Sequence, residues 1–306
     1  MAFPGPRSNF RSASPRWRLH LAALGLVGLV LASGCAPGAG PVEPPAHAPA
    51  ETTKTGTGSS IQDQGAPPPE YVPTWPQQTR KTERGFPVNT CVPAGHDSDV
   101  RSLTTPDGGH VPALELGSGE RGILLAHERG RGICSWLPLA EELAAKGYHV
   151  MLFEYRNHGA AEESADTAVM NADTSTALAE LHRRGAQSVL MGGASCGGTS
   201  TMITATGEPE LTGLLILSSP VSCREGDAAD AVRTIAKPAF FAVSPGDMQG
   251  GHQRELEKIF AAAGTADKHL EIVPGERHGT DMLNHAEDGG NLRRLILGFV
   301  DSAFAR

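Results

Sequence analysis

The segment from Ser188 to Gly198 reads Ser-Val-Leu-Met-Gly-Gly-Ala-Ser-Cys-Gly-Gly and gives the strongest indication of the fold. Its first four residues are typical of a buried strand, its glycines of a tight turn, and the residues that follow of a helix. The pattern G-x-S-x-G between a strand and a helix is that of a nucleophile elbow, which holds Ser195 in a strained conformation above the sheet. A phosphate-binding loop would need a Lys after the glycines, and Gly198-Thr199-Ser200 has none. We therefore predict that Ser195 is a nucleophile.

A serine hydroxyl needs a base, and the base needs an acid that orients it. Loops after two later predicted strands offer both groups. Asp247 ends Ser-Pro-Gly-Asp after the apolar run at residues 239–243, and His278 lies in Gly-Glu-Arg-His-Gly after the run at residues 270–273. Because parallel strands bring their carboxyl ends to one edge of a sheet, we expect Asp247 and His278 to converge there on Ser195.

Attack on a carbonyl also needs two N–H donors for the oxyanion. The residue after the nucleophile supplies one, so we assign it to the backbone N–H of Cys196. The second is expected in the loop after the strand at residues 122–126. We assign it to Arg129, with Glu128 as the alternative.

Outward from the elbow, strand-like and helix-like runs alternate. The predicted strands are residues 100–104, 111–116, 122–126, 149–155, 188–191, 211–217, 239–243 and 270–273. The predicted helices are residues 136–146, 174–184, 198–205, 228–235, 253–263 and 291–304. This alternation predicts an α/β fold with an eight-stranded, mostly parallel sheet that carries helices on both faces. About twenty residues separate residue 217 from Lys237, so no large cap domain is expected.

The amino-terminal end has the pattern of a secretory signal. Residues 1–34 contain four arginines and no acid, and their apolar run at 21–32 is too short to span a bilayer. The ending Leu-Ala-Ser-Gly-Cys resembles the bacterial lipobox, in which the cysteine is lipidated and becomes the new amino terminus. We expect residues 1–34 to be a lipoprotein signal peptide and Cys35 the lipidation site. An ordinary signal peptide with an incidental Cys35 is the alternative.

Residues 35–85 are expected to be a disordered tether behind the lipidated cysteine, because ten prolines lie between residues 36 and 82 and large apolar residues are scarce. Residues 86–306 then form the catalytic domain. Loss of the signal would change the net charge from −8 to −12, which argues against nucleic acid as a partner. Membrane attachment in the cell envelope would therefore depend on the acyl chains at Cys35.

Four cysteines remain beyond Cys35, an even number in an exported domain. They are Cys91, Cys134, Cys196 and Cys223, and three pairings are possible. We favour Cys91–Cys134 with Cys196–Cys223, and four free thiols are the alternative. No cluster of His, Cys and Asp has the sequence spacing of a metal site, so neither a metal nor a cofactor is expected.

Together these motifs resemble those of the α/β-hydrolase superfamily over about residues 97–306. They are Ala-His-Glu-Arg-Gly, Glu-Tyr-Arg-Asn-His-Gly, Gly-Ala-Ser-Cys-Gly-Gly, Ser-Pro-Gly-Asp and Gly-Glu-Arg-His-Gly, in the proper order. The series is most similar to the dienelactone hydrolase-like and serine-esterase branches. The resemblance implies a serine hydrolase with Ser195, Asp247 and His278 as its triad. Glu128 departs from the glycine that many relatives have there, and a dienelactone hydrolase proper has cysteine as its nucleophile.

We thus expect an exported, membrane-tethered serine hydrolase that cleaves small-molecule carboxylic esters through an acyl-enzyme. A serine peptidase or amidase is an alternative because the same attack serves both and only the leaving group differs. A binding lipoprotein that keeps the fold without catalysis is a second alternative. The sequence does not define the natural substrate or the oligomeric state.

Overall fold

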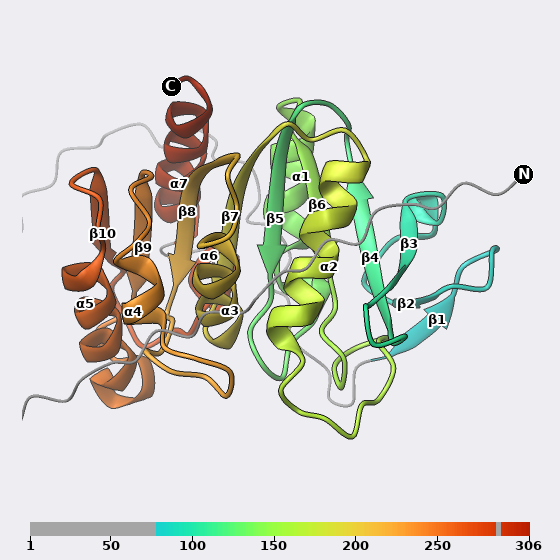
Figure 1. Ribbon diagram of the computed structural model, residues 1–306, viewed down its shortest axis with the longest axis horizontal. Coiled ribbons are helices and arrows are strands. Elements are labelled where there is room, and N and C mark those ends of the chain that lie inside the picture. The colour runs from blue at the N-terminus through green and yellow to red at the C-terminus, as the bar shows by residue number, and fades with distance from the viewer. Residues whose placement is uncertain (1–77, 286–288) are drawn as a thin grey trace, which may run out of the picture. The chain divides into compact units, whose positions relative to one another are not determined.

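The computed structural model describes residues 78–285 and 289–306 (Figure 1). The predicted signal peptide, Cys35 and most of the predicted tether lie outside the described residues. The first described elements are the antiparallel strands β1 (Thr79–Lys81) and β2 (Pro87–Asn89). Regular structure is therefore present ahead of residue 86, where the sequence places the start of the domain.

Contacts with distant residues hold this amino-terminal pair. Arg80 donates to Asp97 at 2.6 Å, and Arg84 donates to the carbonyl of Val100 at the same distance. The segment after β2 is joined to the body by a disulfide between Cys91 and Cys134. The local composition of residues 79–85 does not reveal these partners, which is why the sequence alone extends the tether too far.

The main sheet has eight strands in the order β10-β9-β8-β7-β5-β6-β4-β3 (Figure 1). Its pairs β3–β4 and β4–β6 are antiparallel and the others are parallel, which confirms the predicted mostly parallel sheet. The strands are β3 (Val100–Thr104), β4 (His110–Leu116), β5 (Arg121–Ala126), β6 (His149–Phe153), β7 (Ser188–Ala194), β8 (Leu211–Leu217), β9 (Ala239–Val243) and β10 (Lys268–Ile272).

Helices cover both faces of this sheet, as predicted. They are α1 (Leu137–Ala145), α2 (Met170–Arg183), α3 (Cys196–Ala205), α4 (Ala228–Val232), α5 (Gly251–Ala262), α6 (Asp281–Asn284) and α7 (Gly289–Phe304). One apolar core joins the sheet to α1 and α7, and the other joins it to α2, α3, α4 and α5 (Figure 1). The connection from β8 to β9 contains only the five-residue α4 as a helix, so it carries no large cap domain.

Most element boundaries lie within a few residues of the predicted ones, and for two of the shifts the tertiary contacts give the reason. Strand β7 continues to Ala194 because Gly192 and Gly193 still pair with β8. Helix α2 begins four residues early, at Met170, where the carboxylate of Glu225 accepts the backbone N–H of Met170 at 2.6 Å and that of Asn171 at 3.0 Å. A partner 55 residues away thus satisfies N–H groups that a helix start leaves without partners.

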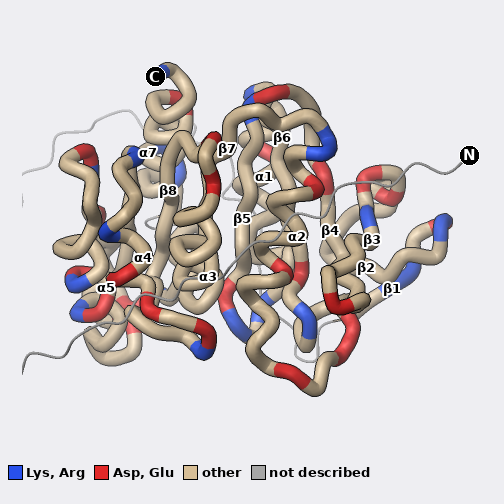
Figure 2. Tube along the Cα trace, in the orientation of Figure 1, with Lys and Arg blue, Asp and Glu red and all other residues tan. Residues whose placement is uncertain are grey.

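Charged residues of both signs are interspersed along the described chain (Figure 2). In the described ranges, no helix is both long and apolar enough to cross a membrane.

Candidate active site

Ser195 lies in the turn between β7 and α3 with φ 51° and ψ −128°. A positive φ is uncommon for a residue with a side chain, and the surrounding hydrogen bonds maintain it here. The N–H of Ser195 donates to the carbonyl of Leu217 at 2.8 Å, and its own carbonyl accepts from Gly198 at 2.8 Å. The residue is 7% exposed. The predicted strained turn is thus present at the predicted serine.

Two glycines make this turn possible because there is no room for a side chain at either position. A Cβ on Gly193 would lie 2.5 Å from the hydroxyl of Thr201 in α3. A Cβ on Gly197 would collide with the backbone carbonyls of Ala126 and His127. The loop that follows β5, in which the second oxyanion donor is predicted, therefore packs against the first turn of α3.

Asp247 and His278 meet as the sequence predicts. Asp247 begins the 3-10 turn Asp247–Gly250 after β9, and His278 lies in the loop after β10. The Nδ1 of His278 donates to both carboxylate oxygens of Asp247 at 2.9 Å. A carboxylate can only accept, so the proton of the neutral ring lies on Nδ1 and its Nε2 is an acceptor.

Burial and hydrogen bonding shift the pKa values of Asp247 and His278 in opposite directions. Burial by itself would raise the pKa of Asp247, but hydrogen bonds from His252 and His278 lower it to about 2. Burial by itself would lower the pKa of His278, but the hydrogen bond and charge of Asp247 raise it above its usual value. The carboxylate is therefore ionised at neutral pH and stabilises a positive charge on His278.

Within the described residues, the hydroxyl of Ser195 makes no direct hydrogen bond to His278. The loop that carries His278 nevertheless reaches the elbow, because a Cβ on Gly279 would lie 3.4 Å from the Cβ of Ala194. Hydrogen bonds between a nucleophile and its base are often long without substrate and tighten in the reacting complex. The structure thus joins Asp247 to His278 and brings the loop of His278 to the residue next to Ser195.

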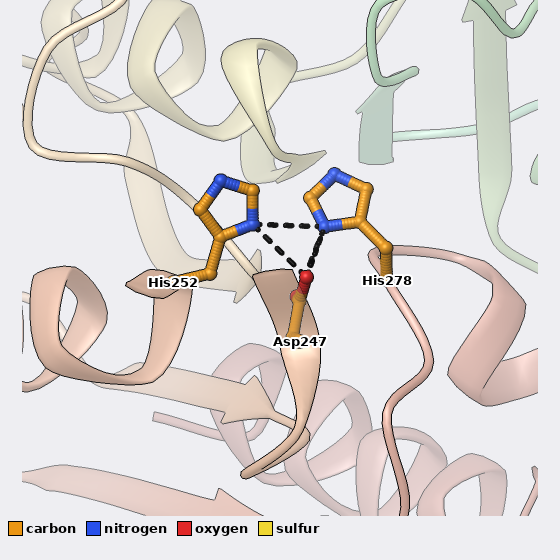
Figure 3. A group of neighbouring side chains, drawn as sticks. All are labelled: Asp247, His252 and His278. Carbon is orange, nitrogen blue, oxygen red and sulfur yellow. Dashed lines mark hydrogen bonds and ion pairs between the residues drawn. The ribbon is translucent and has the colours of Figure 1, made fainter. Parts of the chain in front are cut away.

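His252, in the first turn of α5, is a third member of this group that the sequence analysis missed (Figure 3). Its Nδ1 lies 3.1 Å from Asp247 Oδ1 and 3.0 Å from His278 Nδ1. The expectation that no ligand cluster exists rested on sequence spacing, which cannot show this juxtaposition. The only available signal was a histidine five residues after the predicted acid.

The two predicted oxyanion donors lie on different elements. Cys196 is the first residue of α3, where backbone N–H groups have no partner inside the helix. Arg129 is exposed, and with His158 and Arg224 it lines a cavity of about 200 Å³. Larger cavities of about 570 and 460 Å³ include none of the predicted site residues in their lining.

Glu128, the alternative donor, is buried and connects two loops of the site. Its carboxylate accepts from the hydroxyl of Thr280 at 2.5 Å and from the N–H of Thr280 at 3.3 Å. Burial raises the pKa of this carboxyl group. Because Thr280 follows His278 by two residues, this contact ties the loop after β5 to the loop of the predicted base.

Both favoured cysteine pairings are present. Cys91 is bonded to Cys134 and Cys196 to Cys223, with Cα–Cα distances of 5.8 and 5.4 Å. The second disulfide joins the residue after Ser195 to the loop that follows β8. It restricts the position of that loop beside the elbow.

No protein-family profile matches the chain, and no curated protein matches it. Solved structures do match. A monoacylglycerol lipase from Paleococcus ferrophilus is 14% identical, with a TM-score of 0.55 over 63% of this chain and 99% of its own. A Pyrococcus furiosus esterase is 13% identical, with a TM-score of 0.58 over 77% of this chain and 97% of its own. An esterase from Rhodococcus sp. is 13% identical, with a TM-score of 0.57 over 67% of this chain and 99% of its own. The chain therefore has the α/β-hydrolase fold that these esterases and this lipase share.

Proposed function

We propose that the protein is a serine hydrolase that cleaves small-molecule carboxylic esters with Ser195, Asp247 and His278. The observation that carries this proposal is the hydrogen-bonded pair of Asp247 and His278, on loops at the sheet edge where Ser195 occupies its strained turn. The esterases and the lipase among the similar structures support ester substrates.

The tautomer of His278 determines the first step. With its Nδ1 donating to Asp247, the Nε2 of His278 accepts the hydroxyl proton of Ser195 as the serine oxygen attacks the ester carbonyl. Asp247 remains ionised and stabilises the imidazolium that forms, because its pKa is about 2. The tetrahedral oxyanion is held by the N–H groups of Cys196 and Arg129.

The second half of the cycle releases both products. His278 returns its proton to the leaving alcohol, which leaves an acyl group on Ser195. His278 then takes a proton from water, the water oxygen attacks the acyl carbon, and the proton returns to Ser195. The connection between β8 and β9, which is too short for a large cap domain, suits an open site for small esters.

A fluorophosphonate probe and p-nitrophenyl butyrate test the proposal. We expect the wild-type protein to be labelled and to release p-nitrophenol, and Ser195→Ala to lose both activities. Ser188→Ala, at the opposite end of β7, is the matched control and should keep both. Absence of labelling in folded wild-type protein would refute a serine hydrolase, and turnover of aminoacyl anilides instead of esters would identify a peptidase or amidase.

We also propose that Cys35 is lipidated and anchors the protein to a bacterial membrane in the cell envelope. The support is the sequence around it, a basic segment and a short apolar run that end in Leu-Ala-Ser-Gly-Cys. The proline-rich residues between Cys35 and the described domain would then serve as the tether.

A further inference from the structure

Asp247 has two histidine neighbours, although a serine hydrolase needs only one on its acid. His252 Nδ1 lies 3.1 Å from Asp247 Oδ1, His278 Nδ1 lies 2.9 Å from the same oxygen, and the two nitrogens are 3.0 Å apart. The three atoms therefore form a nearly equilateral triangle (Figure 3). The proposed hydrolytic mechanism gives His252 no role.

Imidazole nitrogens and a carboxylate oxygen are a ligand set that Zn²⁺ binds well. With metal–ligand distances of about 2.0–2.1 Å, tetrahedral geometry separates the ligand atoms by about 3.3 Å. The observed separations of 2.9–3.1 Å need to widen by only a few tenths of an ångström. Three protein ligands leave the fourth position to water, as in open zinc sites.

The surroundings of the triangle favour a cation. In the described part of the chain, no Lys or Arg side chain pairs with any of the three residues. Side-chain exposures of 20% for His252 and 32% for His278 leave a path from solvent, while Asp247 is buried.

We propose that Asp247, His252 and His278 bind a divalent transition cation of the Zn²⁺ class, and that its binding switches off ester hydrolysis. The second half of this proposal rests on the proposed function. A cation takes the lone pair of His278 Nδ1, and the proton on that atom moves to Nε2 of the same ring. A ring that carries its proton on Nε2 cannot accept the proton of Ser195. No electron transfer is involved, and removal of the cation restores the active tautomer.

The test uses the full-length protein after treatment with a chelator and its removal. Zinc binding is measured by calorimetry, and p-nitrophenyl butyrate turnover is measured over the same range of free Zn²⁺. We expect one ion per chain, loss of turnover with the same midpoint as binding, and full recovery with EDTA. Mg²⁺, which prefers oxygen ligands, should not inhibit. Absence of stoichiometric zinc binding would overturn the proposal, and so would turnover that persists with the site filled.

His252→Asn and His252→Gln test the site, and His269→Asn is the matched control because His269 is an exposed histidine on β10. Each His252 variant should weaken zinc binding by at least about tenfold and shift the inhibition midpoint by the same factor. Mutation of residues that only hydrogen-bond to metal ligands already lowers metal affinity by about 10–100-fold. The control should leave both unchanged. Thermal melts establish that each variant is folded.

An inhibition midpoint that is the same in the folded His252 variants as in the wild type would overturn the proposal. Zinc binding that depends on His252 in a protein without ester turnover would support the metal site and refute the proposed function. Ester turnover with no zinc binding would do the reverse, so the two failures are distinguishable.

Discussion

Among single residues, His127 shows how burial fixes a charge state next to the candidate site. Its Nδ1 donates to the carbonyl of Glu128 at 2.8 Å, and its Nε2 accepts the N–H of Tyr155 at 3.1 Å. Burial, reinforced by the charge of His158, lowers the pKa of His127 to about 3. Both ring nitrogens are thus used by a neutral imidazole that links the loop after β5 to the residues after β6.

This depressed pKa predicts a pH-dependent stability. In the unfolded chain His127 binds a proton below about pH 6.5, whereas in the folded protein it does so only near pH 3. The neutral ring therefore contributes fully to the unfolding free energy above pH 6.5. This contribution declines as the pH falls toward 3 and is smaller by about 2 kcal/mol at pH 5. Urea unfolding at pH 7.5 and pH 5 measures the loss.

His127→Gln should lose less unfolding free energy between these two pH values than the wild type does. The same comparison for His269→Gln, which changes an exposed histidine, should match the wild type. An equal loss in His127→Gln and the wild type would contradict the assignment of a neutral, buried ring.

Two glycine positions should respond to alanine with opposite signs. At Gly197 the added Cβ would meet backbone carbonyls at the end of β5 and in the loop after it. We therefore expect Gly197→Ala to lower the unfolding free energy by about 1–3 kcal/mol and to remove much of the ester turnover. At Gly298, an exposed position inside α7, nothing lies within 4 Å, and alanine should stabilise by about 1 kcal/mol. Denaturant unfolding of both variants provides the measurement, and a stable, fully active Gly197→Ala would contradict the close packing.

Among secondary-structure elements, the two disulfides connect parts of the fold that differ in their relation to the site. One joins the segment after β2 to the 3-10 turn Ile133–Ser135, which precedes α1. The other joins the first residue of α3 to the loop after β8, beside Ser195. Both close long loops, so both restrict the unfolded chain, but only the second restrains the elbow.

Removal of each disulfide should separate stability from activity. The two double variants are Cys91→Ala/Cys134→Ala and Cys196→Ala/Cys223→Ala. They remove cross-links that span 43 and 27 residues of the unfolded chain, so the unfolding free energy of each should fall by about 4 kcal/mol at most. Below their unfolding temperatures, the first should keep its p-nitrophenyl butyrate turnover. We expect the second to turn over more slowly because the loop beside the nucleophile is released. The same turnover in both variants would show that the elbow does not need its disulfide.

For the whole molecule, the acidic charge and the lipobox-like ending determine how it would reach a membrane. The net charge is −8 for residues 1–306 and would be −12 without residues 1–34, so the protein would be repelled by anionic lipid. Attachment would therefore be hydrophobic and insensitive to salt.

Expression of the complete chain in bacteria tests this attachment. We expect the wild type to sediment with membranes and to remain there after a high-salt wash, and Cys35→Ala to move to the soluble fraction. Ser33→Ala keeps a small residue before the cysteine and should behave as the wild type. An unchanged membrane fraction for Cys35→Ala would refute the lipid anchor.

The strand–turn–helix around Ser195, the eight strands of the sheet and the loops that carry Asp247 and His278 could all be predicted from the sequence. Hydrophobic period and glycine position are local properties, and the order of parallel strands brings their ends to one edge. The start of α2, the strand β1 ahead of residue 86 and the place of His252 beside Asp247 follow from tertiary contacts. Each of these depends on how loops and turns fold back on one another, which no local pattern along the chain records.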